Sequence, residues 1–329
     1  MTNKRVLLAS RPSGWVSEGN FRIEEAPLPQ PAQGEVLVRN LWLSLDPYMR
    51  GRMSDAKSYV KGVEPGEVMV GQTVGEVVES RNERFAKGDK VLTQLGWQLY
   101  GASREVAKVD EKRAPLSCYL GILGMPGMTA YLGLKEIGQP RPGDTVVVSA
   151  ASGAVGSVVG QLASIWGARA VGIAGGTRKC DYARNELGFD ACIDYKAANL
   201  AQALRQACPA GVDVYFDNVG GEIFDTVLAQ MNLHSRVVVC GLISDYNAAE
   251  PYRLRNWRCV LVNRIKLQGM IVFDWKERYG EALKALGGYF AEGKLKYRES
   301  VVQGLENAPR GLIALLKGEN FGKQLVKLS

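Results

Sequence analysis

The stretch from Asp144 to Trp166, DTVVVSAASGAVGSVVGQLASIW, limits most strictly what this chain can fold into. It opens with the apolar and largely β-branched run Thr145–Val148, which predicts a strand buried on both faces. Small residues follow in the pattern Ala-x-Gly-x-x-Gly, and apolar residues then recur at helical spacing up to Trp166. A strand, a tight turn and a helix in this order predict the βα unit of a dinucleotide-binding fold.

The small residues of the turn each have a physical task in such a unit. Gly153 lets the backbone approach a pyrophosphate, which would lie on free N–H groups at the helix N-terminus. Gly156 and Gly160 let the helix lie close to the sheet. Ala151 stands where the first glycine is usual, and a methyl is tolerated there if φ stays negative. The alternative is chance spacing in a chain with 38 glycines, and the flanking strand and helix argue against it.

Length and composition narrow the class of protein. The 329 residues suffice for two domains with separate cores, at about 150 residues per domain. No apolar run reaches the roughly 18–20 residues that span a bilayer, and the apolar N-terminal patch is shorter than the roughly 7–15 residues of a signal-peptide core. We therefore expect a cytoplasmic protein. The net charge of +7 comes from scattered basic residues, which indicates neither a nucleic-acid arm nor a membrane patch.

Cysteine and histidine usage bears on metal chemistry. The six cysteines include no C-x-x-C pair, so the spacing of a zinc knuckle or redox dithiol is missing. The single histidine, His234, lacks the further ligands of a histidine metal site and makes a Ser-His-Asp triad improbable. We expect His234 at the surface or in a capping position, and we expect no metal.

The chain changes character near residue 120. Before it, short strands alternate with Gly and Pro turns, which predicts a partly open barrel or a sandwich. There, Leu43–Met53 combines aromatic, thioether and basic groups beside a proline turn, either as a pocket wall or as a loop that plugs the barrel with Tyr48 and Met49.

The second part of the chain begins with a hinge and a helix after Pro126. From Gly143 strands and helices alternate, which predicts an α/β doubly wound parallel sheet.

Residues after the second predicted strand indicate whether the cofactor is NADP(H) or NAD(H). In NAD enzymes an acidic residue about 20 positions past the glycine turn bonds the ribose 2′-hydroxyl. Here the segment Ala174–Lys179 holds no carboxylate, and Arg178 and Lys179 stand in its place. A 2′-phosphate would be attracted to them, which favours NADP(H) over NAD(H). The alternative, that the two cations merely begin a helix surface, is weaker because cations are disfavoured at a helix N-terminus.

Six motifs spread over the chain resemble one protein family. They are Ser44–Arg50 (SLDPYMR), Gly124–Tyr131 (GMPGMTAY), Ala150–Gly156 (AASGAVG), Tyr215–Gly221 (YFDNVGG), Cys240–Asn247 (CGLISDYN) and Asn320–Gly322 (NFG). With them the chain resembles the zinc-independent branch of the medium-chain dehydrogenases/reductases. Within that branch it is similar to the leukotriene B4 dehydrogenase, prostaglandin reductase and curcumin reductase group of NADPH-dependent alkenal/one reductases. The resemblance covers nearly all 329 residues.

The resemblance implies a domain plan and a set of site residues. A GroES-like β-barrel domain would comprise residues 1–122 and the return segment 294–329, around a Rossmann NADP-binding domain at 123–293. Tyr246 matches the tyrosine that acts as acid or stabilises the oxyanion, and an aromatic shelf for the cofactor is the alternative. The substrate wall would include Tyr48, Arg50 and Tyr59. The implied cofactor-binding residues are Gly153, Ala154, Val155 and Gly156 for the pyrophosphate; Lys179 and Tyr195 for the 2′-phosphate; Asn218 for ribose and phosphates; and Cys240, Gly241, Leu242, Ile243, Ser244, Met270, Val272, Met125, Thr129, Asn320 and Gly322 for the nicotinamide.

The implied activity is reduction of the carbon–carbon double bond of α,β-unsaturated ketones and aldehydes by NADPH. A quinone oxidoreductase of the same branch and a non-catalytic NADPH-binding protein are the alternatives. The segment Glu250–Asn263 is more basic and aromatic than the Pro/Gly-rich loop usual in the group, which leaves the substrate preference open. The apolar stretch Arg264–Val272 is expected at a sheet edge, where it predicts a homodimer.

Overall fold

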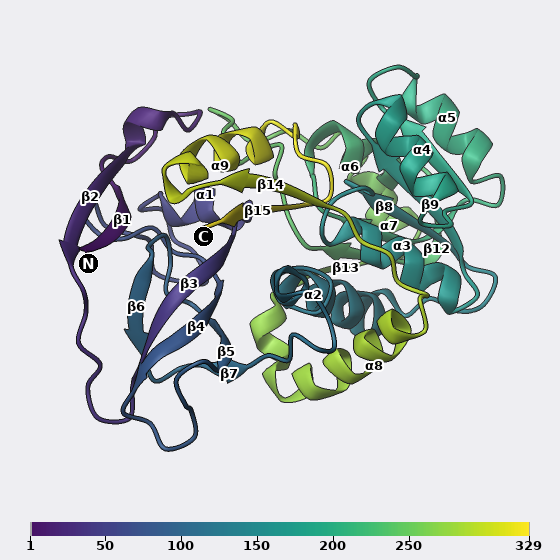
Figure 1. The fold of residues 1–329 in the computed structure, drawn as a ribbon. Coiled ribbons are helices and arrows are strands. Elements are labelled where there is room, and N and C mark those ends of the chain that lie inside the picture. Colours follow the sequence, from purple (N-terminus) through teal and green to yellow (C-terminus); the bar gives the residue numbers. More distant parts are fainter. Residues whose placement is uncertain (1, 329) are drawn as a thin grey trace. The chain divides into compact units, whose positions relative to one another are not determined.

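The computed structural model describes residues 2–328, which divide into two compact units (Figure 1). Unit 1 contains the chain up to Leu120 and resumes at Glu299, and unit 2 is Gly121–Arg298. The sequence analysis expected domain boundaries after residues 122 and 293, which remain a prediction. Unit 1 is thus assembled from two distant segments, whereas unit 2 is continuous in sequence.

Unit 2 is built on a six-stranded sheet with all strands parallel, in the order β10-β9-β8-β11-β12-β13. This confirms the α/β fold with a doubly wound parallel sheet. The five residues of β8 are all buried, as the β-branched run predicts. The strands are β8 (Thr145–Ser149), β9 (Arg169–Ala174), β10 (Ala191–Asp194), β11 (Val212–Asp217), β12 (Met231–Val239) and β13 (Lys266–Gly269).

Helices pack on this sheet and enclose its core. One apolar cluster joins side chains of α5, α6 and α7 to residues of β8 to β12. Elsewhere α2 packs with α3 and α8. The helices are α2 (Met125–Leu132), the π-helix η3 (Gly133–Gly138), α3 (Gly156–Ile165), α4 (Thr177–Asn185), α5 (Leu200–Ala207), α6 (Gly221–Leu228), α7 (Arg258–Val262), the 3-10 helix η4 (Val272–Arg278) and α8 (Tyr279–Ala291).

Unit 1 is mostly β, with helical segments between its strands. Its larger sheet has the order β14-β15-β3-β4-β5-β7, with β6 also on β3, and β1 pairs with β2 in a separate antiparallel pair. The strands are β1 (Thr2–Leu8), β2 (Phe21–Pro27), β3 (Val36–Ser44), β4 (Thr73–Ser80), β5 (Lys90–Thr93), β6 (Tyr100–Ser103), β7 (Ala107–Lys108), β14 (Glu299–Gln303) and β15 (Lys323–Lys327). The helical segments are η1 (Glu18–Asn20), α1 (Tyr48–Arg52), η2 (Leu116–Leu120), η5 (Leu305–Asn307) and α9 (Ala308–Leu316).

The C-terminal strand is fastened to the first segment of unit 1. β15 pairs antiparallel with β3, so the return segment packs on the N-terminal strands as expected. The buried Lys323 donates from Nζ to Asp46 Oδ1 at 2.7 Å and to the Leu45 carbonyl at 2.7 Å. The Ser44 hydroxyl also donates to the Asp46 carboxylate. Burial lowers the pKa of Lys323, while the Asp46 carboxylate opposes that effect.

Three local structures differ from the sequence expectation. The segment expected as a proline turn forms the short helix α1, which starts after Pro47. The expected strand Arg264–Val272 is in the sheet only as Lys266–Gly269, because its partner β12 ends at Val239 and the chain then enters η4. His234 is exposed as expected, but it lies inside β12 with a φ of 58°.

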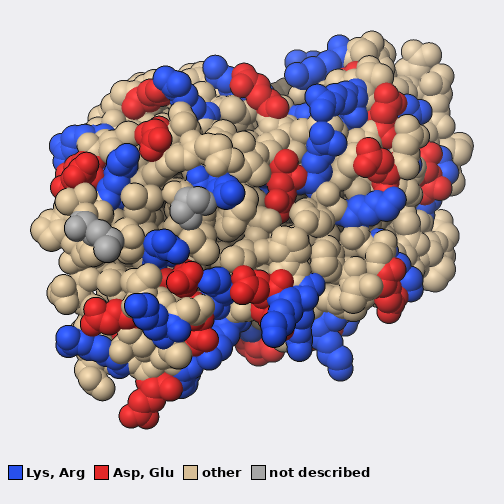
Figure 2. Space-filling model, in the orientation of Figure 1, with Lys and Arg blue, Asp and Glu red and all other residues tan. Residues whose placement is uncertain are grey.

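The surface agrees with a scattered charge surplus. Figure 2 shows lysine and arginine side chains mixed with acidic ones over the visible face. None of the helices among residues 2–328 combines the length and apolar character that crossing a bilayer requires.

Helix α3 lies close enough to its neighbours that Gly160 has no room for a side chain. A Cβ atom built there would be 1.9 Å from Cζ of Phe189. We expect Gly160→Ala to lower the free energy of unfolding by about 1–3 kcal/mol, as overpacking does, and to lower the midpoint of urea unfolding. Gly287→Ala in α8 is the matched control, because nothing lies within 4 Å of its Cβ position. An unchanged midpoint for Gly160→Ala would contradict the close approach.

Candidate functional site

The glycine turn between β8 and α3 wraps around the carbonyl oxygen of Ala150. The Gly153 N–H donates to this oxygen at 2.8 Å, and a Cβ on Gly156 would lie only 2.3 Å from it. Ala150 itself has a left-handed φ of 51°, a costly conformation for a residue with a side chain. Ala151 is buried and is absent from the residues with positive φ, so its methyl is accommodated as expected.

This turn fits a pyrophosphate. Gly153, Ala154, Val155 and Gly156 place only small side chains or none where the chain enters α3. The N–H groups of Ser157 and Val159 already donate to the carbonyls of Gly153 and Val155, so an anion would meet the amides that precede them in the turn.

A buried network joins the ends of β8 and β11. The Ser149 hydroxyl donates to Asp217 Oδ1 at 2.8 Å and accepts from the Asn218 N–H at 2.8 Å. The Asn218 side-chain amide donates to the Ser149 carbonyl at 2.9 Å. Asn218, predicted to meet ribose and phosphates, is therefore held at the carboxyl end of β8 from two directions.

The Asp217 carboxylate organises the loop after β11. Besides the Ser149 bond, it accepts from the Tyr215 hydroxyl at 2.6 Å and from the N–H groups of Val219 and Gly220 at 3.1 and 2.9 Å. Burial raises the pKa of Asp217, and these donors oppose the rise by stabilising the charged form. Backbone N–H groups of Cys240 and Gly241 donate to the Asp217 carbonyl.

The loop Cys240–Tyr246 folds over the loop after β11. The Ser244 hydroxyl donates to the Val219 carbonyl at 2.7 Å, and Leu242 Cδ2 lies 3.0 Å from the Cβ position of Gly220. The Leu242 N–H donates to the Tyr246 hydroxyl at 3.4 Å. The structure thus brings Asn218, Cys240, Gly241, Leu242, Ile243, Ser244 and Tyr246 together at the carboxyl ends of β11 and β12.

Lys179 lies in the first turn of α4, and Tyr195 approaches the turn between β9 and this helix. Tyr195 Oη lies 3.2 Å from the Cβ position of Gly175, and Cε of Lys196 lies 3.0 Å from the same point. Burial lowers the pKa of Lys179, and the charge of Lys196 lowers it further. The Asp194 carboxylate binds backbone groups: its Oδ1 accepts hydrogen bonds from the N–H groups of Gly176 and Lys196. The arrangement suits a phosphate at this turn.

The remaining residues predicted to meet the nicotinamide in unit 2 lie in and around α2. Thr129 is one turn after Met125 in α2, and its hydroxyl donates to the Met125 carbonyl at 2.8 Å. Met270 and Val272 follow β13 and are buried. A Cβ on Gly133 would be 3.3 Å from Cγ of Met270, so this methionine packs beneath η3.

The predicted residues in unit 1 lie around α1 and before β15. Burial and the Asp46 carboxylate raise the pKa of Tyr48, and Tyr59 is close enough to contribute to the rise. Arg50 is buried and donates to the Gly14 carbonyl at 2.9 Å, while Tyr59 is 58% exposed. The Asn320 side chain donates to the Gly322 carbonyl at 2.7 Å, and Gly322 has a φ of 82°.

Sequence reasoning missed Ser149, Asp217 and Lys196. Ser149 and Asp217 are the last residues of two buried strands. A polar residue at the end of an apolar strand is the sequence feature that could have identified them. Lys196 directly follows Tyr195, so its signal was its neighbour in sequence. Among residues 2–328, no group of three His, Cys, Asp or Glu side chains could hold a metal ion.

We expect Ser149→Ala to destabilise unit 2 and to weaken NADPH binding. The substitution leaves the part-buried Asn218 N–H without its acceptor and takes one donor from the buried Asp217 carboxylate, at a cost of about 1–3 kcal/mol. Thermal unfolding and a fluorescence titration with NADPH measure the two effects. Ser164→Ala is the control, since that exposed hydroxyl donates to a carbonyl of its own helix. Equal effects of the two substitutions would rule out the role of the network.

Two family models match the chain. One, described as the N-terminal domain of oxidoreductase, matches residues 4–109, and the other, described as zinc-binding dehydrogenase, matches residues 154–287.

Relatives match over nearly the full length. The chain is 49% identical over 335 residues to a NADPH-dependent curcumin reductase of Escherichia coli strain K12, covering 99% of this chain and 97% of that protein. It is 42% identical over 337 residues to a 2-alkenal reductase (NADP(+)-dependent) of Nicotiana tabacum, covering 100% and 98%. The crystal structure of CurA in complex with NADPH from Vibrio vulnificus matches with a TM-score of 0.95 and 49% identity, covering 99% of each chain. The chain therefore belongs to the medium-chain dehydrogenase/reductase family.

Proposed function

We propose that this protein is an NADPH-dependent reductase of the carbon–carbon double bond of α,β-unsaturated ketones and aldehydes. The observation that carries the proposal is full-length identity of 49% and 42% to reductases named for curcumin and 2-alkenals. Both compounds have a double bond conjugated to a carbonyl group. The cofactor follows from the NADPH complex of a 49% identical structure and from the cations at the turn after β9.

The reaction needs a hydride donor and a group that stabilises charge on oxygen. When bound, NADPH supplies the hydride for the β-carbon of the substrate. Negative charge then builds on the substrate carbonyl oxygen, and a hydrogen-bond donor aimed at this oxygen lowers the barrier. Protonation of the α-carbon completes the reduction.

Tyr246 is the candidate donor. It is partly buried, and its hydroxyl lies beside Gly241 and the Leu242 N–H, on the loop that folds over Asn218. A phenol with an ordinary pKa near 10 remains protonated at neutral pH. Tyr48 and Tyr59 are proposed for the substrate wall, where the raised pKa of Tyr48 keeps its hydroxyl a donor.

We expect Tyr246→Phe to lower the rate constant of the chemical step by about 100–1000-fold, the usual effect of removing one oxyanion donor. Single-turnover decay of NADPH absorbance after mixing with an enone measures this step without product release. Tyr289→Phe is the control, because the Tyr289 hydroxyl only accepts from the Trp166 indole N–H at 3.4 Å. An unchanged rate constant in Tyr246→Phe would exclude the donor role and leave the cofactor shelf.

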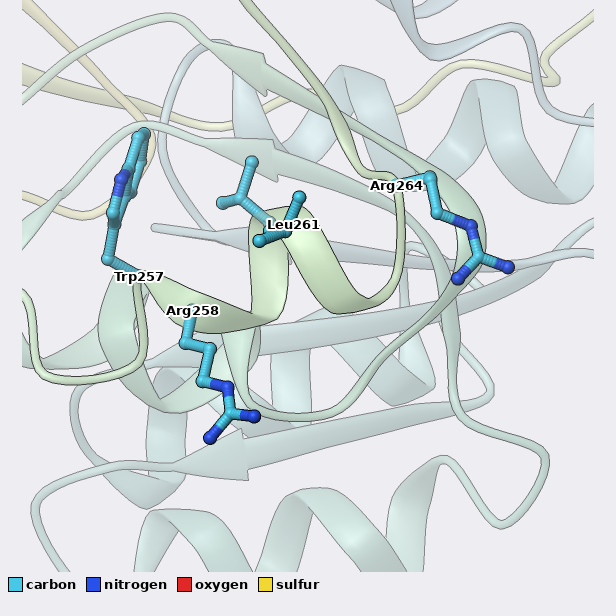
Figure 3. A pocket seen from close by; sticks show the side chains of 5 residues that line it. Trp257, Arg258, Leu261 and Arg264 are labelled. Carbon is cyan, nitrogen blue, oxygen red and sulfur yellow. The ribbon is translucent and has the colours of Figure 1, made fainter.

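The same proposal includes a cytoplasmic homodimer formed through the β13–α7 face. We define this face by the exposed side chains Trp257, Leu261, Val262 and Leu267, which are 54%, 79%, 50% and 38% exposed. β13 is an edge strand, and exposed edges and apolar patches recruit partners. Figure 3 shows Trp257 and Arg264 at opposite ends of α7 with Leu261 between them. Together with Arg258 and Val260 they line a hollow of about 470 Å³.

We expect Leu261→Asp to convert the dimer into monomers, because a carboxylate buried in an apolar interface loses its hydration. Light scattering coupled to size-exclusion chromatography at micromolar concentration measures the mass. Leu283→Asp on α8 is the control, since Leu283 is 40% exposed on another helix. A monomeric wild-type protein would refute the interface.

A further inference from the structure

The turn between β9 and α4 has a lysine beside it, Lys196, in addition to the cations Arg178 and Lys179 that the sequence analysis identified. Lys179 stands in the first turn of α4, and the side chain of Lys196 approaches the same turn from the loop after β10. The two ammonium groups are close enough for the charge of Lys196 to act on Lys179. Two ammonium groups that approach the same turn repel each other, and an anion bound there would offset this repulsion.

Glycine at position 175 leaves room for the side chains of Lys196 and Tyr195 at this turn. A Cβ atom there would be 3.0 Å from Cε of Lys196 and 3.0 Å from Cε1 of Tyr195. Both side chains therefore lie across the Gly175–Gly176 turn rather than away from it. Any residue with a side chain at 175 would displace them.

Asp194 fixes the backbone of both segments. Its Oδ1 accepts from Gly176 N–H at 2.8 Å and from Lys196 N–H at 3.1 Å, which ties the turn after β9 to the loop after β10. These two bonds direct this carboxylate to the backbone, and the ammonium of Lys196 lies over the turn.

We propose that Lys196 is a second ammonium group for the 2′-phosphate of NADPH and helps to discriminate NADPH from NADH. The inference rests on the proposed function, which needs NADPH, and adds a residue to the phosphate site predicted from Lys179 and Tyr195. A lysine ammonium is a point charge that suits a phosphate. NADH has a hydroxyl in place of this phosphate, so Lys196 contributes little to NADH binding.

The test compares nucleotide affinities of full-length Lys196→Met and wild-type protein by isothermal titration calorimetry. We expect the Kd for NADPH to rise about tenfold, equivalent to about 1.4 kcal/mol, while the Kd for NADH stays the same. Adenosine 2′-phosphate should lose affinity similarly, and adenosine 5′-phosphate should not. Lys196→Arg should retain most of the affinity, because it keeps the positive charge.

Two controls separate this role from general electrostatics and from the proposed function. Lys284→Met on α8 removes the same charge from an exposed helix and should leave both Kd values unchanged. Lys179→Met should weaken NADPH binding. If it does so while Lys196→Met binds NADPH like the wild type, the inference about Lys196 is wrong and the phosphate site stands. If wild-type protein does not prefer NADPH over NADH, the cofactor assignment itself fails.

Discussion

The hydrogen bond from the buried Ser149 hydroxyl to the Asp217 carboxylate is the interaction on which the cofactor side of the molecule depends. A buried carboxylate is costly unless several donors surround it. Here the donors are a serine, a tyrosine and two backbone N–H groups, which come from the end of β8, from β11 and from the loop after β11. The same residue accepts two bonds at its carbonyl from the loop after β12. One side chain and its backbone therefore set the relative positions of three strand ends.

The sequence predicted the features that depend on neighbouring residues. The buried run of β8 and the glycine turn follow from local pattern. The cations at positions 178 and 179 predicted the cofactor for the same reason, since they lie in the first turn of α4. Each of these predictions rests on residues that are near one another in the sequence.

Features that depend on distant residues escaped prediction. Ser149 and Asp217 lie on strands that become neighbours only through the sheet, so no local pattern reveals their bond. β13 is shorter than the apolar stretch because its partner β12 ends at Val239, which accepts from the Met270 N–H. Helix α1 has five residues, too few to show an apolar period. Lys196 follows Tyr195 in the sequence, but the approach of its side chain to the turn at Gly175 depends on the fold.

Two lysine environments show how the fold separates structural from ligand-binding charge. Lys323 is buried and already paired with Asp46, which makes it a fastening between β15 and the end of β3. The pKa of Lys179 is lowered by burial and by the nearby charge of Lys196, and an anion bound there would offset the repulsion between the two lysines.

The place of β15 between β14 and β3 has a consequence for a chain that emerges from the ribosome. β3 is synthesised early, yet the strand that pairs with its last residues, Trp42 to Ser44, follows the whole of unit 2. Unit 2 can complete its sheet from contiguous residues, as domains do during synthesis. The nascent N-terminal segment meanwhile keeps an open strand edge of the kind that chaperones shield from other chains.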